Sequence, residues 1–234
     1  NPSAPNDIAV RDYVRGALFG IAAVGIWSGW MLAARFSIKG NLSPWDILAI
    51  RFLVAGPLLL PILVRKGLAL DRLGWSGLAA LLIGGGAPMV LVGNAGLLFA
   101  PAAHGSALFT GTIPIMVAVV AALLIRERFT LVKRIGLVLV SAGVLGIVWG
   151  AGGTFGSRQN LGHLMFLSAS VLWAFYTVAM RKARLDGLHA AAIAGVGAFL
   201  TFEPAYFAVN GLWALSDASW GDLALQAIVQ GVLT

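Results

Sequence analysis

The 234-residue chain is 59% hydrophobic and only 11% charged, whereas a typical soluble domain has about 25% charged residues. Too few polar side chains are available to cover a water-exposed surface, so the composition excludes a soluble globular protein and predicts an integral membrane protein. The chain has no Cys and only three scattered His, which excludes disulfides and thiolate chemistry and favours neither a metal site nor a cofactor. The net charge of +7 would suggest a nucleic-acid partner in a soluble protein, but its distribution, described below, indicates membrane topology instead.

Seven segments are long and apolar enough to cross the hydrocarbon layer as helices, which takes about 20 residues. An eighth begins near Trp220. Arg11 and Arg15 precede the first segment, but it is too long for a signal peptide and we predict a true span. The seven predicted spans are residues 14–36, 45–64, 73–99, 102–125, 131–150, 161–180 and 188–214.

Lys and Arg residues gather in alternate loops. If the N-terminus lies inside, only Arg35, Lys39 and Arg158 fall outside, and Arg51 falls within the second span. This bias predicts a cytoplasmic N-terminus. We expect the membrane to be a bacterial inner membrane. The inner residues are Arg11, Arg15, Arg65, Lys66, Arg72, Arg126, Arg128, Lys133, Arg134, Arg181, Lys182 and Arg184.

The first and sixth spans resemble each other. GALFGIAAVGIWSGWMLAARF from Gly16 aligns with GHLMFLSASVLWAFYTVAMRK from Gly162, and Trp27 aligns with Trp173. Five spans separate the copies, so the second copy runs in the opposite direction, as in inverted-repeat transporters. We expect an all-α bundle built as a 5+5 inverted repeat of ten spans, of which this chain holds about seven and a half. The predicted parts are a cytoplasmic segment 1–13, a first repeat 14–150, an extracytoplasmic connector 151–160 and an incomplete second repeat 161–234.

Two stretches carry a family resemblance: RFLVAGPLLLPIL from Arg51, and the longer block from Gly93 that contains Pro114, the Glu127-Arg128 turn and a Gly-rich fifth span. Together with the Trp-bearing first and sixth spans, they resemble the EamA-type transporters of the drug/metabolite transporter superfamily. The resemblance covers nearly the whole chain. It implies ten helices, cytoplasmic termini, and export of amino acids or similar small metabolites.

Two charged residues lie well inside predicted spans, away from the ends, where charge is costly and indicates function. Arg51 and Glu203 both fall in the outer halves of their spans. We hypothesise that they pair, or alternate in pairing, as gating or coupling residues. Alternatively, Arg51 reaches the headgroups and Glu203 bonds neighbouring helices. Proton coupling would use Glu203, next to Pro204, unless the protein is an uncoupled facilitator.

Candidate substrate contacts are aromatic or polar residues within spans. Trp27, Trp30, Trp173 and Tyr176 would face one another across the repeat axis and suit an apolar or aromatic substrate; the alternative is lipid contact or packing. Candidate hydrogen-bonding residues, which could equally bond neighbouring helices, are Asn94, Thr110 and Thr112. The interfacial aromatic belt is predicted at Trp45, Trp75, Trp149, Trp213 and Trp220.

Glycine and proline mark positions where helices break or approach each other closely. Residues 84–86 are all Gly and precede Pro88, which should weaken the third span. Pro57, Pro61 and Pro114 can kink the second and fourth spans. In the fifth span, Gly136, Gly143 and Gly146 are interpreted as sites of close helix packing.

Other functional classes fit less well. An intramembrane serine protease needs a matched Ser and His, and a channel needs charged rings or a filter loop; the sequence has neither, so no catalytic residue is predicted. A seven-span receptor does not account for the eighth span or the repeat. The partners expected are a small-molecule substrate and the lipid bilayer, with an importer or a nucleotide-sugar antiporter as alternatives. The oligomeric state is left open.

Overall fold

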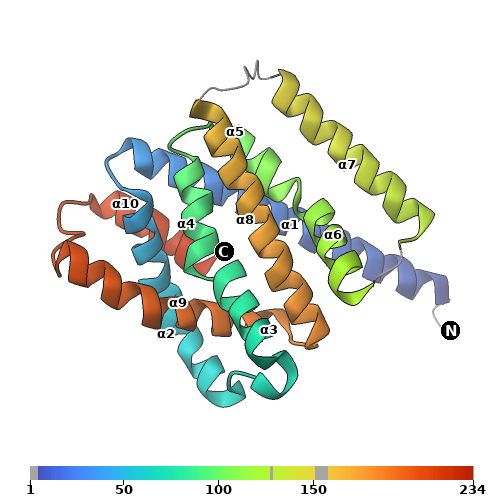
Figure 1. The fold of residues 1–234 in the computed structure, drawn as a ribbon, viewed down its shortest axis with the longest axis horizontal. Helices are drawn as coiled ribbons and strands as arrows, with labels where there is room; N and C mark the ends of the chain where they lie inside the picture. The colour runs from blue at the N-terminus through green and yellow to red at the C-terminus, as the bar shows by residue number, and fades with distance from the viewer. Residues whose placement is uncertain (1–4, 127–128, 151–157, 234) are drawn as a thin grey trace.

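The computed structural model describes residues 5–126, 129–150 and 158–233, and these residues form helices and no strands (Figure 1). Long helices lie side by side and enclose the apolar core between them. The elements are α1 (Pro5–Lys39), α2 (Pro44–Lys66), α3 (Leu70–Gly84), α4 (Ala87–Gly96), α5 (Ala102–Gly105), the π-helical turn η1 (Ser106–Thr110), α6 (Ile113–Ile125), α7 (Leu131–Gly150), α8 (Arg158–Lys182), α9 (Gly187–Asn210), α10 (Trp220–Gln226) and the π-helical turn η2 (Ala227–Val232).

Six candidate membrane spans occur among the described residues, which confirms a polytopic membrane protein. They are Arg11–Lys39, Pro44–Lys66, Leu70–Gly96, Ala102–Ile125, Arg158–Lys182 and Gly187–Asn210. The 20-residue α7 has the bounds predicted for the fifth span. The seventh span ends at Asn210 rather than residue 214, because Gly211 takes a positive φ of 81° and stops the helix.

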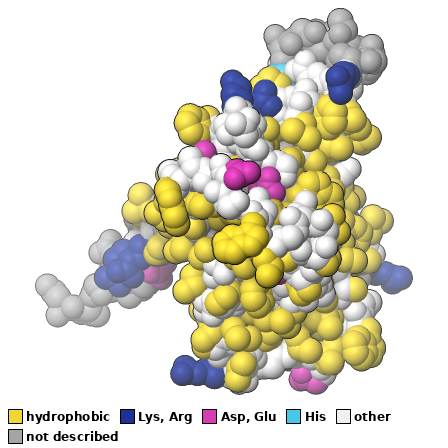
Figure 2. Space-filling view, turned by 90° about the vertical axis from the view of Figure 1, so that its left-hand side faces the viewer, with side chains coloured by type: hydrophobic (Ala, Val, Ile, Leu, Met, Phe, Trp, Pro, Cys, Tyr) yellow, Lys and Arg dark blue, Asp and Glu magenta, His cyan; other side chains and the backbone are white. Residues whose placement is uncertain are grey.

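Exposed hydrophobic side chains cover much of the surface, as a lipid-facing protein requires. Figure 2 shows this on the side where α9 and α10 lie, with a group of acidic side chains in the upper half of the view. Four of the five predicted belt tryptophans are more than half exposed (Trp45, Trp75, Trp213 and Trp220). The side chain of Trp149 and the Glu127-Arg128 turn lie outside the described residues.

Two predicted breaks divide spans into shorter helices. The third span is interrupted between α3 and α4 at Gly85 and Gly86, as the glycine run predicted. The fourth span is divided into α5, η1 and α6, and Pro114 occupies the first turn of α6. By contrast, Pro57 and Pro61 lie inside α2, which continues through both.

The main packing contacts join α2 to α9, and α8 to α3, α4 and α6. Phe52, Leu97, Phe109 and Phe166 are among the least exposed residues of the central apolar cluster. The helix α7 lies at the edge of the bundle, and its principal neighbours are α6 and η1 (Figure 1).

The glycines of α7 have no close packing partner among the described residues. A Cβ atom added to Gly136, Gly143 or Gly146 would meet nothing there within 4 Å. The interpretation of these residues as packing sites is therefore wrong for the part of the chain that the structure describes. The glycines that do mark close contact lie in the break between α3 and α4. A Cβ at Gly84 would collide with the Leu172 carbonyl oxygen, and one at Gly85 would collide with the Tyr176 ring.

The two ends of the bundle differ in charge. We call the end where α2, α6 and α8 finish and α3 and α9 begin the basic end, and the other the opposite end. The basic end carries Arg65, Lys66, Arg72, Arg126, Arg181, Lys182 and Arg184.

Candidate functional site

Arg51 extends from α2 into the centre of the bundle. It lies seven residues after Pro44, about 10 Å along the helix from the opposite end, and is 8% exposed. The guanidinium carbon Cζ is 5.9 Å from the centroid of the Trp30 ring and 5.7 Å from that of Phe52. Both distances are within the range of cation–π attraction, which helps to offset the loss of water around the charge.

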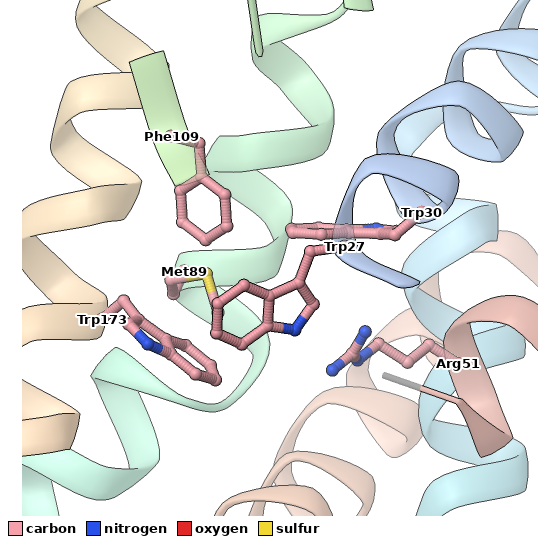
Figure 3. Close-up of a pocket in the computed structure, with 6 residues that line it drawn as sticks. All are labelled: Trp27, Trp30, Arg51, Met89, Phe109 and Trp173. Atoms are coloured by element: carbon pink, nitrogen blue, oxygen red, sulfur yellow. The ribbon is translucent and has the colours of Figure 1, made fainter. Parts of the chain in front are cut away.

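Aromatic side chains from different helices enclose the guanidinium end of Arg51. Figure 3 shows this end pointing toward Trp27, with Trp173 on the far side of that indole. Trp27 of α1 meets Trp173 of α8 edge to face with centroids 5.5 Å apart, and Trp30 meets Phe109 of η1 in the same way at 5.4 Å. The cavity between them is small, about 10 Å³, and is lined by Trp27, Trp30, Arg51, Met89, Phe109 and Trp173.

A second, larger cavity of about 270 Å³ shares Arg51 and Trp173 with the first. Tyr176 also lines it and packs against Trp173, with ring centroids 4.9 Å apart. Its wall includes Leu188, the second residue of α9, so the cavity extends from Arg51 toward the basic end. The two cavities share Arg51 and Trp173, so the buried guanidinium group lies among the indole and phenol rings that line them.

This arrangement suits a ligand with a carboxylate and an apolar or aromatic part. A guanidinium group binds a carboxylate through two parallel hydrogen bonds. The indole rings offer flat apolar surfaces for stacking, and their faces attract an ammonium group.

The structure brings together four of the predicted substrate contacts. Trp27, Trp30 and Trp173 line the first cavity, and Tyr176 lines the second. Arg51, predicted as a gating or coupling residue, lines both. Sequence reasoning missed Met89 and Phe109, which are ordinary apolar residues. The available signal was the pair of broken spans that carry them, because irregular membrane backbone is tolerated where it lines a cavity.

Glu203 is 4% exposed, and neither of its carboxylate oxygens has a hydrogen-bond partner among the described residues. It lies seven residues before the end of α9, about 10 Å along the helix from the opposite end, a depth similar to that of Arg51. In this conformation the two residues therefore do not pair. Glu203 is also not among the residues that line the two cavities.

The predicted polar contacts lie outside both cavities. Asn94 is fully buried in α4, and neither its amide nitrogen nor its oxygen has a hydrogen-bond partner among the described residues. Thr110 likewise has an unpartnered buried hydroxyl. The Thr112 hydroxyl donates to the Leu108 carbonyl at 2.5 Å and lies 2.9 Å from the Ser170 hydroxyl of α8. Its hydrogen bonds are therefore made to the backbone of the preceding turn and to a neighbouring helix.

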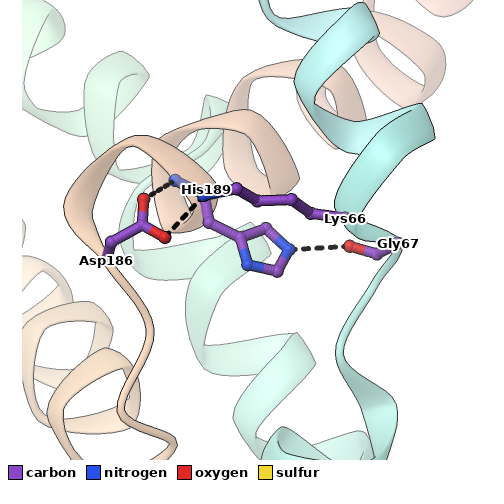
Figure 4. A network of polar contacts seen from close by, with 4 residues as sticks. All are labelled: Lys66, Gly67, Asp186 and His189. Atoms are coloured by element: carbon purple, nitrogen blue, oxygen red, sulfur yellow. Dashed lines mark hydrogen bonds and ion pairs between the residues drawn. The ribbon is translucent and has the colours of Figure 1, made fainter.

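A polar network at the basic end joins α2 to α9, near Leu188 (Figure 4). The Lys66 ammonium donates to the Asp186 carboxylate at 2.7 Å, and the backbone N–H of His189 donates to the other carboxylate oxygen at 2.9 Å. His189 Nε2 lies 2.8 Å from the Gly67 carbonyl oxygen and, because a carbonyl only accepts, is the donor. The hydrogen bond from Lys66, followed by that from the backbone, holds the pKa of Asp186 below its ordinary value.

The fold and this site define a polytopic helical membrane protein with an arginine–aromatic cavity between its helices. A family model described as the EamA-like transporter family matches residues 14–149. The chain belongs to this family, which confirms the resemblance found in the sequence. No curated protein and no solved structure matches the chain.

Proposed function

We propose that the protein exports amino acids or similar small carboxylates across a bacterial inner membrane by alternating access. Family membership supports transport of a small molecule. The observation that supports this substrate class is the position of Arg51, whose guanidinium group lies in a cavity walled by Trp27, Trp30 and Trp173.

In this proposal Arg51 binds the substrate carboxylate. Trp27 and Trp173 contact the apolar part of the substrate and, through their ring faces, its ammonium group. A rigid-body rocking motion needs weak points in the helices, which the α3–α4 break and the π-helical turn η1 supply. Both interrupted spans contribute to the cavity wall, through Met89 and Phe109.

The orientation and architecture belong to the same proposal. The basic end faces the cytoplasm, in agreement with the positive-inside rule, and the N-terminus lies on that side. The first repeat comprises residues 14–150, the connector 151–160, and residues 161–234 belong to the second copy of a 5+5 inverted repeat. The larger cavity then leads from Arg51 toward the cytoplasm, the side from which an exporter loads.

Glu203 is proposed as the coupling carboxylate. It is buried, without a hydrogen-bond partner among the described residues, at a depth similar to that of Arg51. Protonation removes its charge and favours its burial in an apolar environment. In the other state of the transport cycle, an ionised Glu203 would pair with Arg51 after the substrate has left.

The test is flux in proteoliposomes containing the protein, using radiolabelled amino acids with and without an imposed pH gradient. We expect saturable transport of an aromatic or large apolar amino acid. The same amino acid as its carboxamide, which lacks the carboxylate, should compete far less well. Arg65→Gln is the matched control for Arg51→Gln, because Arg65 is an exposed arginine at the far end of the same helix.

The outcomes distinguish the alternatives. Equal competition by the acid and its amide would overturn the role of Arg51. Transport only of nucleotide sugars, in exchange for nucleotides, would replace the amino-acid substrate with the antiporter alternative. Substrate movement only toward the cytoplasmic side of the membrane would make the protein an importer.

A further inference from the structure

A groove separate from the substrate cavities runs between α3, α6 and α8 at the basic end. Its volume is about 340 Å³. The apolar part of the wall includes Ala80 of α3, Leu124 of α6, and Phe175 and Val178 of α8. Leu124 is 56% exposed and Phe175 39%, so two large hydrophobic side chains lie open on the outside of the bundle.

Two cations from different helices line the same groove. Arg72 lies in the first turn of α3, and Lys182 is the last residue of α8. Both residues are exposed. Asp71 comes no closer than 3.9 Å to Arg72, in a solvent-exposed pair, and such a pair contributes little binding energy. Ser76 also lines the groove.

The position of these cations along the bundle axis is the one expected for the membrane surface. The backbone of α3 bends at Gly74, whose φ of 62° and ψ of 178° are not helical. Arg72 precedes the bend, and Trp75, directly after it, is 78% exposed. An exposed tryptophan at the end of a span is typical of the headgroup region, so this criterion places Arg72 at headgroup depth and Ala80, eight residues further along α3, deeper in the bilayer.

We propose that this groove is a binding site for an anionic phospholipid. The phosphate of the headgroup lies between Arg72 and Lys182, Ser76 donates a hydrogen bond to it, and one acyl chain lies along Ala80, Leu124 and Phe175. Basic pockets between membrane helices bind anionic headgroups in this way. The apolar wall selects a lipid over a free phosphate, because inorganic phosphate has nothing to bury against Leu124 and Phe175.

Because α3 and α8 both lie beside the larger substrate cavity, which is lined by Gly85 at the end of α3 and by Tyr176 of α8, a lipid bound between them contacts two helices of the transport region. The site is nevertheless distinct from the Arg51 cavity. Its occupancy can therefore be measured without any transport assay.

The experiment counts lipids retained by the purified full chain in native mass spectrometry, after incorporation into nanodiscs of phosphatidylcholine with a minor fraction of phosphatidylglycerol. Wild-type protein should retain phosphatidylglycerol in preference to phosphatidylcholine. The double variant Arg72→Gln/Lys182→Gln should weaken this retention roughly 10- to 30-fold. The matched control, Arg15→Gln/Arg65→Gln, has the same change in net charge at exposed positions outside the groove and should retain the lipid as the wild type does.

Two further measurements separate the lipid from its headgroup phosphate. Ala80→Phe fills the acyl part of the groove and leaves both cations in place, so it should reduce phosphatidylglycerol retention. Its thermal unfolding in pure phosphatidylcholine shows whether the fold is intact. Excess inorganic phosphate should not displace the lipid. Equal retention by the two double variants, full retention by a folded Ala80→Phe protein, or displacement by phosphate would each overturn the proposal.

Discussion

Arg51 carries a charge at a depth where hydration is poor, and the surrounding side chains compensate for this. The Trp30 and Phe52 rings lie within 6 Å of its guanidinium carbon. Charged groups inside a span persist where they serve a substrate or ion pathway. Arginine is also rigid in its geometry, since its planar group presents hydrogen-bond donors in a fixed fork.

Lysine at position 51 should not restore the carboxylate-binding function proposed for Arg51. A lysine keeps the charge but loses the two-point contact with a carboxylate, and glutamine loses both. We expect transport efficiency, kcat/KM, to fall roughly 10-fold in Arg51→Lys and 100-fold in Arg51→Gln, because a hydrogen bond to a charged group contributes about 1.5–3 kcal/mol. Initial rates in proteoliposomes measure both values. Wild-type efficiency in Arg51→Lys would mean that charge alone is needed.

Glu203→Gln tests proton coupling by removing the ionisable group while keeping the side-chain size. Transport driven by a pH gradient should disappear, whereas exchange of labelled for unlabelled substrate at equal pH should continue. If the protein is an uncoupled facilitator, wild-type transport will not depend on the pH gradient and Glu203→Gln will not change it.

The proposed alternating pair of Arg51 and Glu203 is tested by exchanging the two charges. The variant Arg51→Glu/Glu203→Arg should recover part of the transport activity lost in the single variants, and no recovery would contradict pairing.

At the scale of elements, broken helices and close helix contacts position the cavity. The glycine run between α3 and α4 interrupts one span and also lets α8 approach, since a side chain at Gly84 or Gly85 would collide with Leu172 or Tyr176. Trp173 lies one residue after Leu172 on α8. The position of this indole relative to Met89 of α4 therefore depends on the close approach of these helices.

Gly84→Ala should destabilise the protein. Its new methyl group would collide with the Leu172 carbonyl oxygen, and a backbone atom cannot move aside as a flexible side chain can. Overpacking of this kind costs about 1–3 kcal/mol. The matched control is Gly136→Ala in α7, where the methyl group meets nothing within 4 Å and alanine favours the helix. Thermal unfolding in one detergent compares the two, and equal midpoints would contradict the close approach of α8 to Gly84.

The ion pair at the start of α9 predicts a pH effect of known sign. Because the folded-state pKa of Asp186 is lowered by Lys66 and the His189 backbone, its contribution to stability is present above the ordinary carboxyl pKa of 3.8. That contribution is lost as pH falls through the lower folded-state pKa. Asp186→Asn keeps a helix-capping side chain but removes the charge. The variant should therefore be slightly less stable than wild type at pH 7, and the difference should vanish in strong acid.

Since both partners are about half exposed, the effect should be small and should shrink further in high salt. Thermal midpoints measured across the pH range, in low and high salt, give the comparison. A difference that is constant with pH would show that the cap, rather than the charge, carries the effect.

Sequence patterns predicted the positions of the helices well, because membrane spans are set by apolar length and their breaks by Gly and Pro. They also identified Arg51 and the tryptophans of the cavity, since charge and repeated aromatic residues stand out in an apolar chain. They could not assign Met89 or Phe109, which look like any other core residues. For the glycines of α7 they predicted a packing partner that the described residues do not supply, because glycine spacing does not reveal whether a neighbouring helix is present.

At the scale of the whole molecule, the two ends differ in charge, and this predicts how the protein sits in the membrane. Ser216 lies in the exposed loop between α9 and α10, and Leu68 in the connection between α2 and α3 at the basic end. Because the chain has no Cys, single cysteines at these positions can be labelled without background.

In intact cells, a membrane-impermeant maleimide should label Ser216→Cys. It should label Leu68→Cys only after the membrane has been permeabilised. The reverse pattern would invert the proposed orientation. It would also place the larger cavity, which extends from Arg51 toward the basic end, on the external side.

The contact between α1 and α10 has a consequence for the order of biogenesis. Ser37 of α1 donates to Asp222 at 2.8 Å, and Gln226 donates to both the Ala33 carbonyl and the Ser37 hydroxyl at 2.9 Å. A segment that carries an aspartate and a buried glutamine partitions poorly from the translocon into lipid by itself. Helix α10 therefore depends on an earlier span, made nearly 200 residues before it, to accept its polar groups.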